Sequence, residues 1–553
     1  MVISFEFLDR NRIATIDRGV YAEEITEKAY SFYMEEVLHT GRTDIDIIPP
    51  SYYRKLISDN VELLNNNLDI PERIRNVLKP YQLECIKRMV SQKRIINACI
   101  MGMGKTIQAI CSMMLLRSNE YGDLVVCPGS LRSNWGREFK KWAPDVPIQI
   151  ISKVGSSTEH IQSCLNQTFT FKKGVTIISY ELFSKLSSMM KASQRGKKYF
   201  QTIVCDESHY LKDTETSRFT NIRPFLVQVD NLFLMSGTPS PNRPVELYAQ
   251  LKLLDSKTFD SKRIFTDRYC NGFTDRWGVY NARGSSKTTE LSQLLFKYMV
   301  RCTNVEKDIS TTTITRTVSY VNIGPTVLEK DHEIEMKNII KKISEHGISV
   351  DLQSEISQLF HETASAKIEP IIRLLEERFV KKKDFDEKVI LFCTHMVMFS
   401  AVTSFFTSQN IKHIGIHGGT IPSSRDKLIG QFLDFERDDA IDVAILTLGT
   451  CSTGINLIPV RKMIFLELQW TPSIIHQAEC RINRIGGASD LEYEYILARR
   501  TLDMYVYNML FQKNQIITDI IDNGENVHDA FDFSSKCINS LSSMLNQYHE
   551  DEQ

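Results

Sequence analysis

Two stretches of the chain alternate short apolar runs with longer helical patterns, and this alternation constrains the fold more than any other feature. Apolar strands that lack polar alternation and are joined by helices are typical of parallel sheets covered on both faces. We therefore expect an α/β fold of two similar lobes, each built on a parallel sheet. The first set of apolar runs covers 95–100, 124–127, 175–179, 202–205 and 231–235, and the second covers 388–393, 413–417, 441–447, 462–466 and 492–497.

The sequences around these two stretches have a different character and divide the chain into five regions. The region between the lobes is rich in Ser, Thr, Lys and aromatic residues, which indicates insertions and a helical linker. The amino-terminal region is mixed, and we expect a helix in it near Tyr21–Leu38. The tail ends in an acidic run, and we expect a short helix and a frayed end there. The five regions are 1–75, 76–255, 256–365, 366–515 and 516–553.

The composition bears on the class of protein and on its partners. Hydrophobic residues make up 42% and charged residues 24%, which is typical of a soluble globular protein rather than a disordered one. No uncharged apolar stretch approaches the roughly 18 residues of a membrane helix, so we expect no membrane association. The amino terminus has no basic segment followed by an apolar core, so we expect no secretory signal. The net charge of -1 means that any contact with nucleic acid must come from local basic patches.

The 12 cysteines are scattered, and none forms the C-x-x-C pair that is typical of zinc and redox sites. Several of them, such as Cys205 and Cys393, lie inside apolar runs. A free thiol in such a run behaves as a small buried hydrophobe. This cysteine usage fits a reducing, interior compartment.

A glycine-rich segment, Gly102–Thr106, directly follows the first apolar run and precedes a helical pattern. Glycines in this position let backbone N–H groups approach phosphate oxygens, while Lys105 reaches the β- and γ-phosphates and the Thr106 hydroxyl binds Mg²⁺. Cys99 stands where the usual phosphate-loop pattern begins with glycine. The alternative is a glycine turn with an exposed lysine. We expect ATP to be bound by Gly102, Met103, Gly104, Lys105 and Thr106.

Acidic residues follow a later apolar run of the same lobe. A carboxylate at the carboxyl end of a strand is where a phosphate-loop fold holds Mg²⁺ and the attacking water. We assign Asp206 to the metal and Glu207 to the water; the alternative is a solvated acidic turn that caps a helix. His209 by itself is more typical of a packing residue. The segment Ser236–Pro239 ends the next apolar run and offers hydroxyls that could sense hydrolysis.

Two features of the second lobe predict contacts with phosphate. Arg481 and Arg484 are three residues apart and share one face if helical, where they could stabilise the charge of a transferring phosphoryl group. In isolation, such a pair is more often solvated or salt-bridged. The loop at 447–456 consists mainly of small residues, and its N–H and hydroxyl groups could contact a nucleic-acid backbone. It could equally be a plain turn.

With these motifs in this order, residues 75–520 resemble the Swi/Snf-type ATPases of helicase superfamily two. Gln82, in Leu78–Gln82, resembles the family's glutamine that recognises adenine. Cys127–Leu131 resembles a family motif that runs along a DNA strand. The resemblance is closer to the annealing-helicase, fork-remodelling branch, and is carried there by 243–248, 268–271, 277–278, 284–286 and 290–291.

The resemblance implies two RecA-like lobes with helical insertions between them, ATP and Mg²⁺ as cofactors, and translocation on double-stranded or forked DNA. It also implies replication or repair proteins as candidate partners, and we expect a monomer in the nucleus, or at a viral replication site if the chain is virus-encoded. The alternatives are a nucleosome remodeller and a non-catalytic DNA-binding scaffold with a decayed ATP site. The residues that we expect to contact nucleic acid are Ser130, Ser179, Thr238, Thr450 and Ser452.

Several positions depart from the pattern of the family. Cys99 and Ile100 replace an acidic pair before the phosphate loop, and Arg301-Cys302 replaces two arginines. In the loop at 447–456, which resembles the family's motif five, Ser452 replaces a glycine. In the segment around Arg481 and Arg484, which resembles motif six, Cys480, Asn483 and Gly487 replace Asp, His and Gln. Because Lys105, Asp206, Glu207, Arg481 and Arg484 are all retained, we expect hydrolysis to be retained.

Overall fold

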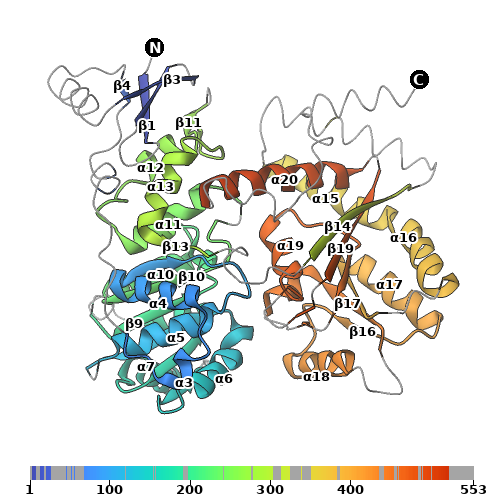
Figure 1. Cartoon of the computed structure of the whole chain (residues 1–553). Helices are drawn as coiled ribbons and strands as arrows, with labels where there is room; N and C mark the ends of the chain where they lie inside the picture. The colour runs from blue at the N-terminus through green and yellow to red at the C-terminus, as the bar shows by residue number, and fades with distance from the viewer. Residues whose placement is uncertain are drawn as a thin grey trace.

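In the computed structural model of the chain, two α/β lobes lie side by side (Figure 1). The structure describes residues 68–302, 313–323 and 350–521, residues 52, 55 and 338, and four short strands within residues 1–46. Within these ranges the gaps are 119, 154, 156, 191–196, 241, 276–277, 383–386, 435–440, 454–456, 459, 484–486, 489 and 500.

The first lobe is built on a seven-stranded sheet with the order β13-β5-β10-β9-β6-β8-β7. Every pairing in this sheet is parallel. The strands are β5 (Arg94–Asn97), β6 (Gly122–Cys127), β7 (Ile148–Ile150), β8 (Val175–Ser179), β9 (Phe200–Asp206), β10 (Asn231–Met235) and β13 (Met299–Val300). The main helices are α4 (Pro80–Gln92), α5 (Lys105–Leu116), α6 (Arg132–Trp142), α7 (Thr158–Thr170), α8 (Tyr180–Met189), α10 (Ser217–Leu226) and α11 (Val245–Leu254).

Neighbouring residues of the central strands enter different hydrophobic clusters. On β10, Leu232 packs in the cluster that contains residues of α8 and α10, whereas Phe233 packs in the cluster that contains residues of α4, α5 and α6. Both side chains are fully buried. The absence of polar alternation in the apolar runs therefore has a direct cause, because helices cover both faces of the sheet.

The second lobe repeats this architecture with a six-stranded parallel sheet in the order β14-β19-β18-β15-β17-β16. Its strands are β14 (Thr313–Val321), β15 (Val389–Cys393), β16 (His413–Ile416), β17 (Val443–Thr447), β18 (Lys462–Phe465) and β19 (Asp490–Ala498). Its helices include α15 (Val350–Ala366), α16 (Ile368–Leu375), α17 (Met396–Ser408), α18 (Pro422–Leu433), α19 (Pro472–Glu479) and α20 (Leu502–Ile521). The expected α/β fold of two RecA-like lobes with parallel sheets is confirmed.

The region between the lobes does more than link them, because it supplies an edge strand to each sheet. Strand β13 pairs with β5 of the first sheet, and β14 pairs with β19 of the second. Helices α12 (Lys262–Tyr269) and α13 (Thr288–Tyr298) pack on the first lobe, and a small hairpin of β11 (Phe273–Thr274) and β12 (Tyr280–Asn281) lies between them in sequence. A buried ion pair joins the two helices, with 2.6 Å between Arg268 Nε and Glu290 Oε1.

Helix α20 connects the two lobes, as Figure 1 shows. Near its start, Val506 and Leu510 are buried in the core of the second lobe. At its end, Ile520 and Ile521 are buried in the core of the first lobe, and the helix lies against α13. The part of the tail that we expected to be frayed lies outside the described residues.

The predicted helix near Tyr21–Leu38 is wrong over its first residues. Val20–Ile25 forms strand β3, which pairs antiparallel with β2 (Ile13–Asp17). The sheet order is β3-β2-β1-β4, with β1 (Ile3–Phe7) and β4 (Ile45–Asp46). Pairing with a neighbouring strand has overridden the local helical pattern. Residues 26–38 lie outside the described part of the chain.

Within the described part of the chain, no helix is both long and apolar enough to cross a membrane.

Candidate functional site

The glycine-rich segment forms a loop between β5 and α5. Its backbone has positive φ at Gly102 (82°) and at Gly104 (74°), where α5 begins. A Cβ atom on Gly104 would lie 2.4 Å from Gln82 Nε2, so that position is closed to a side chain by both conformation and space. The loop therefore ends at a helix amino terminus, whose N–H groups attract phosphate.

The Lys105 ammonium lies within this loop. Its Nζ donates to the carbonyl oxygens of Cys99 at 2.8 Å and Ile100 at 3.2 Å. Burial lowers the pKa of Lys105, and the negative charges of Glu207, Cys99 and Asp206 oppose that shift. A phosphate that enters the loop would meet a cation held close to the acidic residues at the end of β9.

Three side chains hold the loop from α4 and α5. The Met103 carbonyl accepts from Gln82 Nε2 at 3.1 Å, from Gln108 Nε2 at 3.0 Å and from the Tyr81 hydroxyl at 3.4 Å. Gln82 also accepts from the backbone N–H of Lys79 at 2.9 Å. Gln82, which the sequence predicts as the adenine reader, is thus buried and hydrogen-bonded to the loop in this structure.

Asp206 is the last residue of β9, where it accepts from Trp135 Nε1 at 2.8 Å. Burial, followed by the charge of Glu207, raises the pKa of Asp206 to about 6. Carboxylate and hydroxyl oxygens are the donors that Mg²⁺ prefers, so Asp206 and Thr106 at the start of α5 fit that ion. The sequence motifs did not predict the hydrogen bond from Trp135. The sequence indicates it only in that a buried indole N–H needs an acceptor.

Glu207 follows with a left-handed backbone conformation (φ 52°). Burial acts to raise its pKa, but the contact with His209 and the charges of Lys105 and Arg481 lower it. His209 Nδ1 lies 3.3 Å from Glu207 Oε2 and 3.2 Å from Ser236 Oγ. Glu207 is therefore held ionised, as an acceptor for a water proton requires, and His209 joins it to the next motif.

The segment Ser236–Pro239 lies against the phosphate loop. Ser236 Oγ accepts from the backbone N–H of Thr238 at 3.2 Å, and a Cβ on Gly237 would lie 2.9 Å from Met101 Cγ. Arg301 binds both segments, because its Nη1 donates to Ala98 O at 2.6 Å and to Gly237 O at 3.0 Å. The sequence identified Arg301 only as the remnant of an arginine pair.

In the second lobe, Arg481 follows the end of α19 and its residue is only 4% exposed. The neighbouring Glu479 accepts from Arg316 Nε at 3.2 Å and from Arg316 Nη2 at 3.1 Å, and also from the Tyr495 hydroxyl. Because the charge of Arg481 lowers the pKa of Glu207, the two side chains lie within electrostatic reach of one another across the lobes. Arg484, the other predicted arginine, lies outside the described residues.

The predicted nucleic-acid contacts have different surroundings. Ser130 is exposed just after β6, whereas Ser179 is buried and its side chain accepts from Leu182 N at 3.3 Å as the N-cap of α8. Thr238 is half-buried beside the phosphate loop. Thr450 is buried and donates to Thr447 O at 2.6 Å, so its hydroxyl does not face the surface. The side chain of Ser452 is not among those described.

Two family models match the chain. The model of the SNF2-related domain matches residues 81–385, and the model of the helicase conserved C-terminal domain matches residues 366–486. Together they include every predicted catalytic residue.

The chain is similar to several longer proteins, of which it spans about half the length. It is 26% identical over 498 residues to SWI/SNF-related matrix-associated actin-dependent regulator of chromatin subfamily A-like protein 1 of Xenopus tropicalis, covering 88% of this chain and 50% of the relative. It is 27% identical over 475 residues to a DNA annealing helicase and endonuclease of Homo sapiens, covering 84% and 42%. Among solved structures, the SWI2/SNF2 ATPase core of Sulfolobus solfataricus in complex with double-stranded DNA matches at 19% identity and a TM-score of 0.37, covering 86% of this chain and 99% of that one.

Proposed function

Because the chain belongs to the SNF2-related family, we propose that it is a DNA-dependent ATPase that translocates on duplex DNA and remodels forked or branched DNA. The observation that supports this proposal is that the charges of Lys105, from the same lobe, and of Arg481, from the other lobe, both lower the pKa of the buried Glu207. Such a set is what phosphoryl transfer needs, since it combines a phosphate-binding cation, an acceptor for the water proton and an arginine for the developing charge.

Each residue has a distinct role in the proposed reaction. Lys105 leaves the carbonyl oxygens of its own loop and binds the β- and γ-phosphates of ATP. Glu207, held by His209, orients the attacking water and accepts its proton. Thr106 and Asp206 are the residues that would hold Mg²⁺, whose charge helps to neutralise the phosphates. Arg481, and with it Arg484, stabilises the charge that spreads over the transferring group.

His209 offers a route from hydrolysis to movement. Its ring bridges Glu207 and Ser236, and the neighbouring Thr238 lies in the segment proposed to contact DNA. When the γ-phosphate is lost, a shift of Glu207 would therefore be passed by the His209 ring to the segment proposed to contact DNA.

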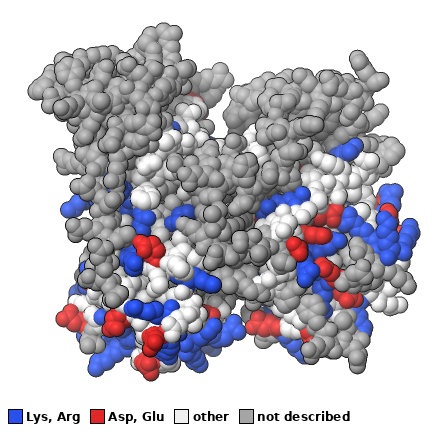
Figure 2. Space-filling model, viewed as in Figure 1, with Lys and Arg blue, Asp and Glu red and all other residues white. Residues whose placement is uncertain are grey.

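DNA is proposed to cross both lobes through local contacts. Figure 2 shows Lys and Arg side chains along the lower edge of the first lobe, interspersed with Asp and Glu. Helix α6 lies at this edge in Figure 1 and carries Lys140 and Lys141 in its last turn, and the exposed Ser130 lies just before this helix. The human relative is named a DNA annealing helicase and the Xenopus relative a regulator of chromatin; we propose forked DNA rather than nucleosomes as the substrate because the motifs at 243–248 and 268–271 resemble the fork-remodelling branch. We further propose a nuclear location.

The test is a steady-state ATPase assay of the full chain with forked, linear duplex or no DNA. We expect stimulation by forked DNA, loss of activity in Lys105→Ala and little change in Lys185→Ala, an exposed lysine on α8. Stimulation should weaken as salt rises, because phosphate contacts release counterions. Equal activity with and without DNA, or full activity in Lys105→Ala, would overturn the proposal. Nucleosome sliding without fork regression on matched substrates would favour the chromatin alternative.

A further inference from the structure

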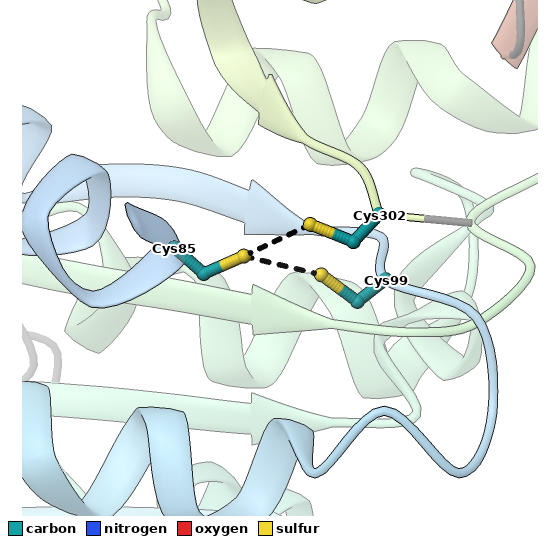
Figure 3. Close-up of side chains that lie close together, drawn as sticks. All are labelled: Cys85, Cys99 and Cys302. Carbon is teal, nitrogen blue, oxygen red and sulfur yellow. Dashed lines mark hydrogen bonds between the residues drawn. The ribbon is translucent and has the colours of Figure 1, made fainter. Parts of the chain in front are cut away.

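Three cysteine side chains meet beside the phosphate loop, as Figure 3 shows. Cys85 comes from α4, Cys99 from the segment after β5, and Cys302 from the segment after β13. The sulfur of Cys85 lies 3.5 Å from that of Cys99 and 3.3 Å from that of Cys302, and all three lie within 4.8 Å of one another. All three residues are buried. In the described part of the chain, no other trio of His, Cys, Asp or Glu side chains brings its ligand atoms this close.

We propose that Cys85, Cys99 and Cys302 bind a soft, thiophilic metal ion of the zinc or copper(I) class. Thiolates select such ions over hard ones. Zinc–sulfur bonds of about 2.3 Å separate the sulfurs of a tetrahedral site by about 3.8 Å. The observed separations of 3.3 and 3.5 Å are a few tenths of an ångström from that value, a difference that small side-chain rotations can supply.

The charges around the cluster suit thiolate ligands. A metal-bound cysteine is deprotonated, and buried negative charge needs nearby cations. Arg88 lies one helical turn after Cys85 on α4, and Lys105 Nζ lies 2.8 Å from the carbonyl oxygen of Cys99. While no phosphate occupies the loop, these two cations offset part of the excess charge that three thiolates carry around a monovalent or divalent ion.

Two departures from the family pattern meet in this cluster. Cys99 replaces an acidic residue and Cys302 replaces an arginine, and although the two are far apart in sequence, both lie against Cys85. The cluster therefore brings together cysteines that are up to 217 positions apart in sequence.

A bound ion would join three segments of the candidate ATP site. Helix α4 carries Gln82, which holds the phosphate loop through Met103 O. The Cys99 carbonyl accepts from Lys105, and Arg301, next to Cys302, bonds to Gly237 O. Metal binding should therefore stabilise the first lobe, since an ion that binds only the folded state shifts the unfolding equilibrium.

The experiment measures metal binding directly, so its outcome does not depend on ATPase activity. The full chain is purified under reducing conditions, incubated separately with Zn²⁺, Co²⁺ or Cu⁺, desalted and analysed for metal by mass spectrometry. We expect a single retained ion per chain, a thiolate-to-cobalt charge-transfer absorption and a higher melting temperature with metal. Cys85→Ala and Cys302→Ala should lose all three effects, whereas Cys270→Ala, another buried cysteine of the first lobe, should keep them.

Preferential retention of zinc or of copper(I) assigns the ion within the proposed class. The proposal is overturned if the wild-type chain retains no more metal than Cys85→Ala, or if Cys85 is isolated in a disulfide and no metal binds after reduction. Should the alanine variants fail to fold, the wild-type chain decides, because the absence of both a thiolate-to-cobalt absorption and retained copper(I) contradicts the site.

Discussion

The two lobes share a parallel sheet, but the hydrogen bonds described above hold different kinds of group in each. In the first lobe, Lys105 and Asp206 are themselves hydrogen-bonded within the lobe, to Cys99 O and to Trp135 respectively. In the second lobe, Arg316 and Tyr495 hold Glu479, two residues before the candidate catalytic Arg481. These bonds thus fix reactive groups in the first lobe and a supporting carboxylate in the second.

The largest expected effect tests whether the second lobe contributes to catalysis while the first lobe binds the nucleotide. Arg481→Ala should lower kcat by about 10³-fold or more, because an arginine that stabilises transition-state charge acts on chemistry. Nucleotide affinity should change little, since the first lobe holds the phosphates. DNA-stimulated ATPase assays and equilibrium nucleotide binding measure the two quantities. An exposed arginine on α16, changed in Arg373→Ala, serves as the control. If nucleotide affinity falls as much as kcat, Arg481 contributes to binding, and the proposed difference between the two lobes is wrong.

The next effect concerns the scaffold of the second lobe. Arg316→Met removes one partner of a buried ion pair and should lower the free energy of unfolding by about 3 kcal/mol. Loss of hydrogen-exchange protection should be confined to β19 and α19, and kcat should fall as well because Glu479 is no longer held beside Arg481. Arg268→Met breaks the buried pair between α12 and α13. Arg268→Met should lower the free energy of unfolding, measured with denaturant, by a similar amount but leave kcat nearly unchanged. If the two variants lose kcat equally, the Arg316–Glu479 pair has no specific role in catalysis.

In the first lobe, function and stability should oppose one another at Asp206. The pKa of an unfolded aspartate is about 3.9, whereas burial raises that of Asp206 to about 6. The folded state therefore favours the protonated form, and this stabilisation is present below the unfolded pKa and is lost as pH rises through 6. Asp206→Asn should abolish hydrolysis yet raise the free energy of unfolding by about 1–2 kcal/mol at pH 7.5. Melting curves should show that Asp206→Asn stabilises the chain less at pH 5 than at pH 7.5. If the stabilisation does not depend on pH, it does not come from removing the ionised carboxylate.

The smallest expected effect lies on α20, between the lobes. Lys513 donates to Trp470 O at 2.9 Å, and burial, followed by the charge of Arg243, lowers its pKa to about 8. Because the folded state binds this proton less tightly than the unfolded state, the stability of the wild-type chain should rise with pH above 8. Lys513→Met should be more stable than the wild-type chain by less than about 1 kcal/mol at pH 7, since a hydrogen bond is lost as well. The gap between the two melting temperatures should narrow by pH 9.5; a constant gap would contradict the shifted pKa.

Local sequence was most informative where a motif follows a buried strand. The apolar runs at 175–179 and 231–235 coincide with β8 and β10, and the fold brings Asp206 and Glu207 close to Lys105. Both faces of these strands are covered, so their apolar pattern has few other solutions. The roles assigned to these residues remain predictions.

The features that the sequence did not predict depend on contacts between residues far apart in the chain. The burial of the Thr450 hydroxyl and the edge strands from the region between the lobes arise from tertiary packing. The strand at Val20–Ile25 stands where the first residues of a helix were expected, for the same reason. Cys85, Cys99 and Cys302 lack the short spacing of a metal motif, so only the fold reveals that their sulfurs meet.

Helix α20 has a consequence for biosynthesis. The core of the first lobe contains Ile520 and Ile521, which emerge from the ribosome after every strand of both sheets. The amino-terminal half of the chain therefore cannot finish packing as it is translated, although domains generally fold in order of synthesis. A polypeptide that stops short of residue 516 would leave an apolar surface on α13 open to water and to aggregation.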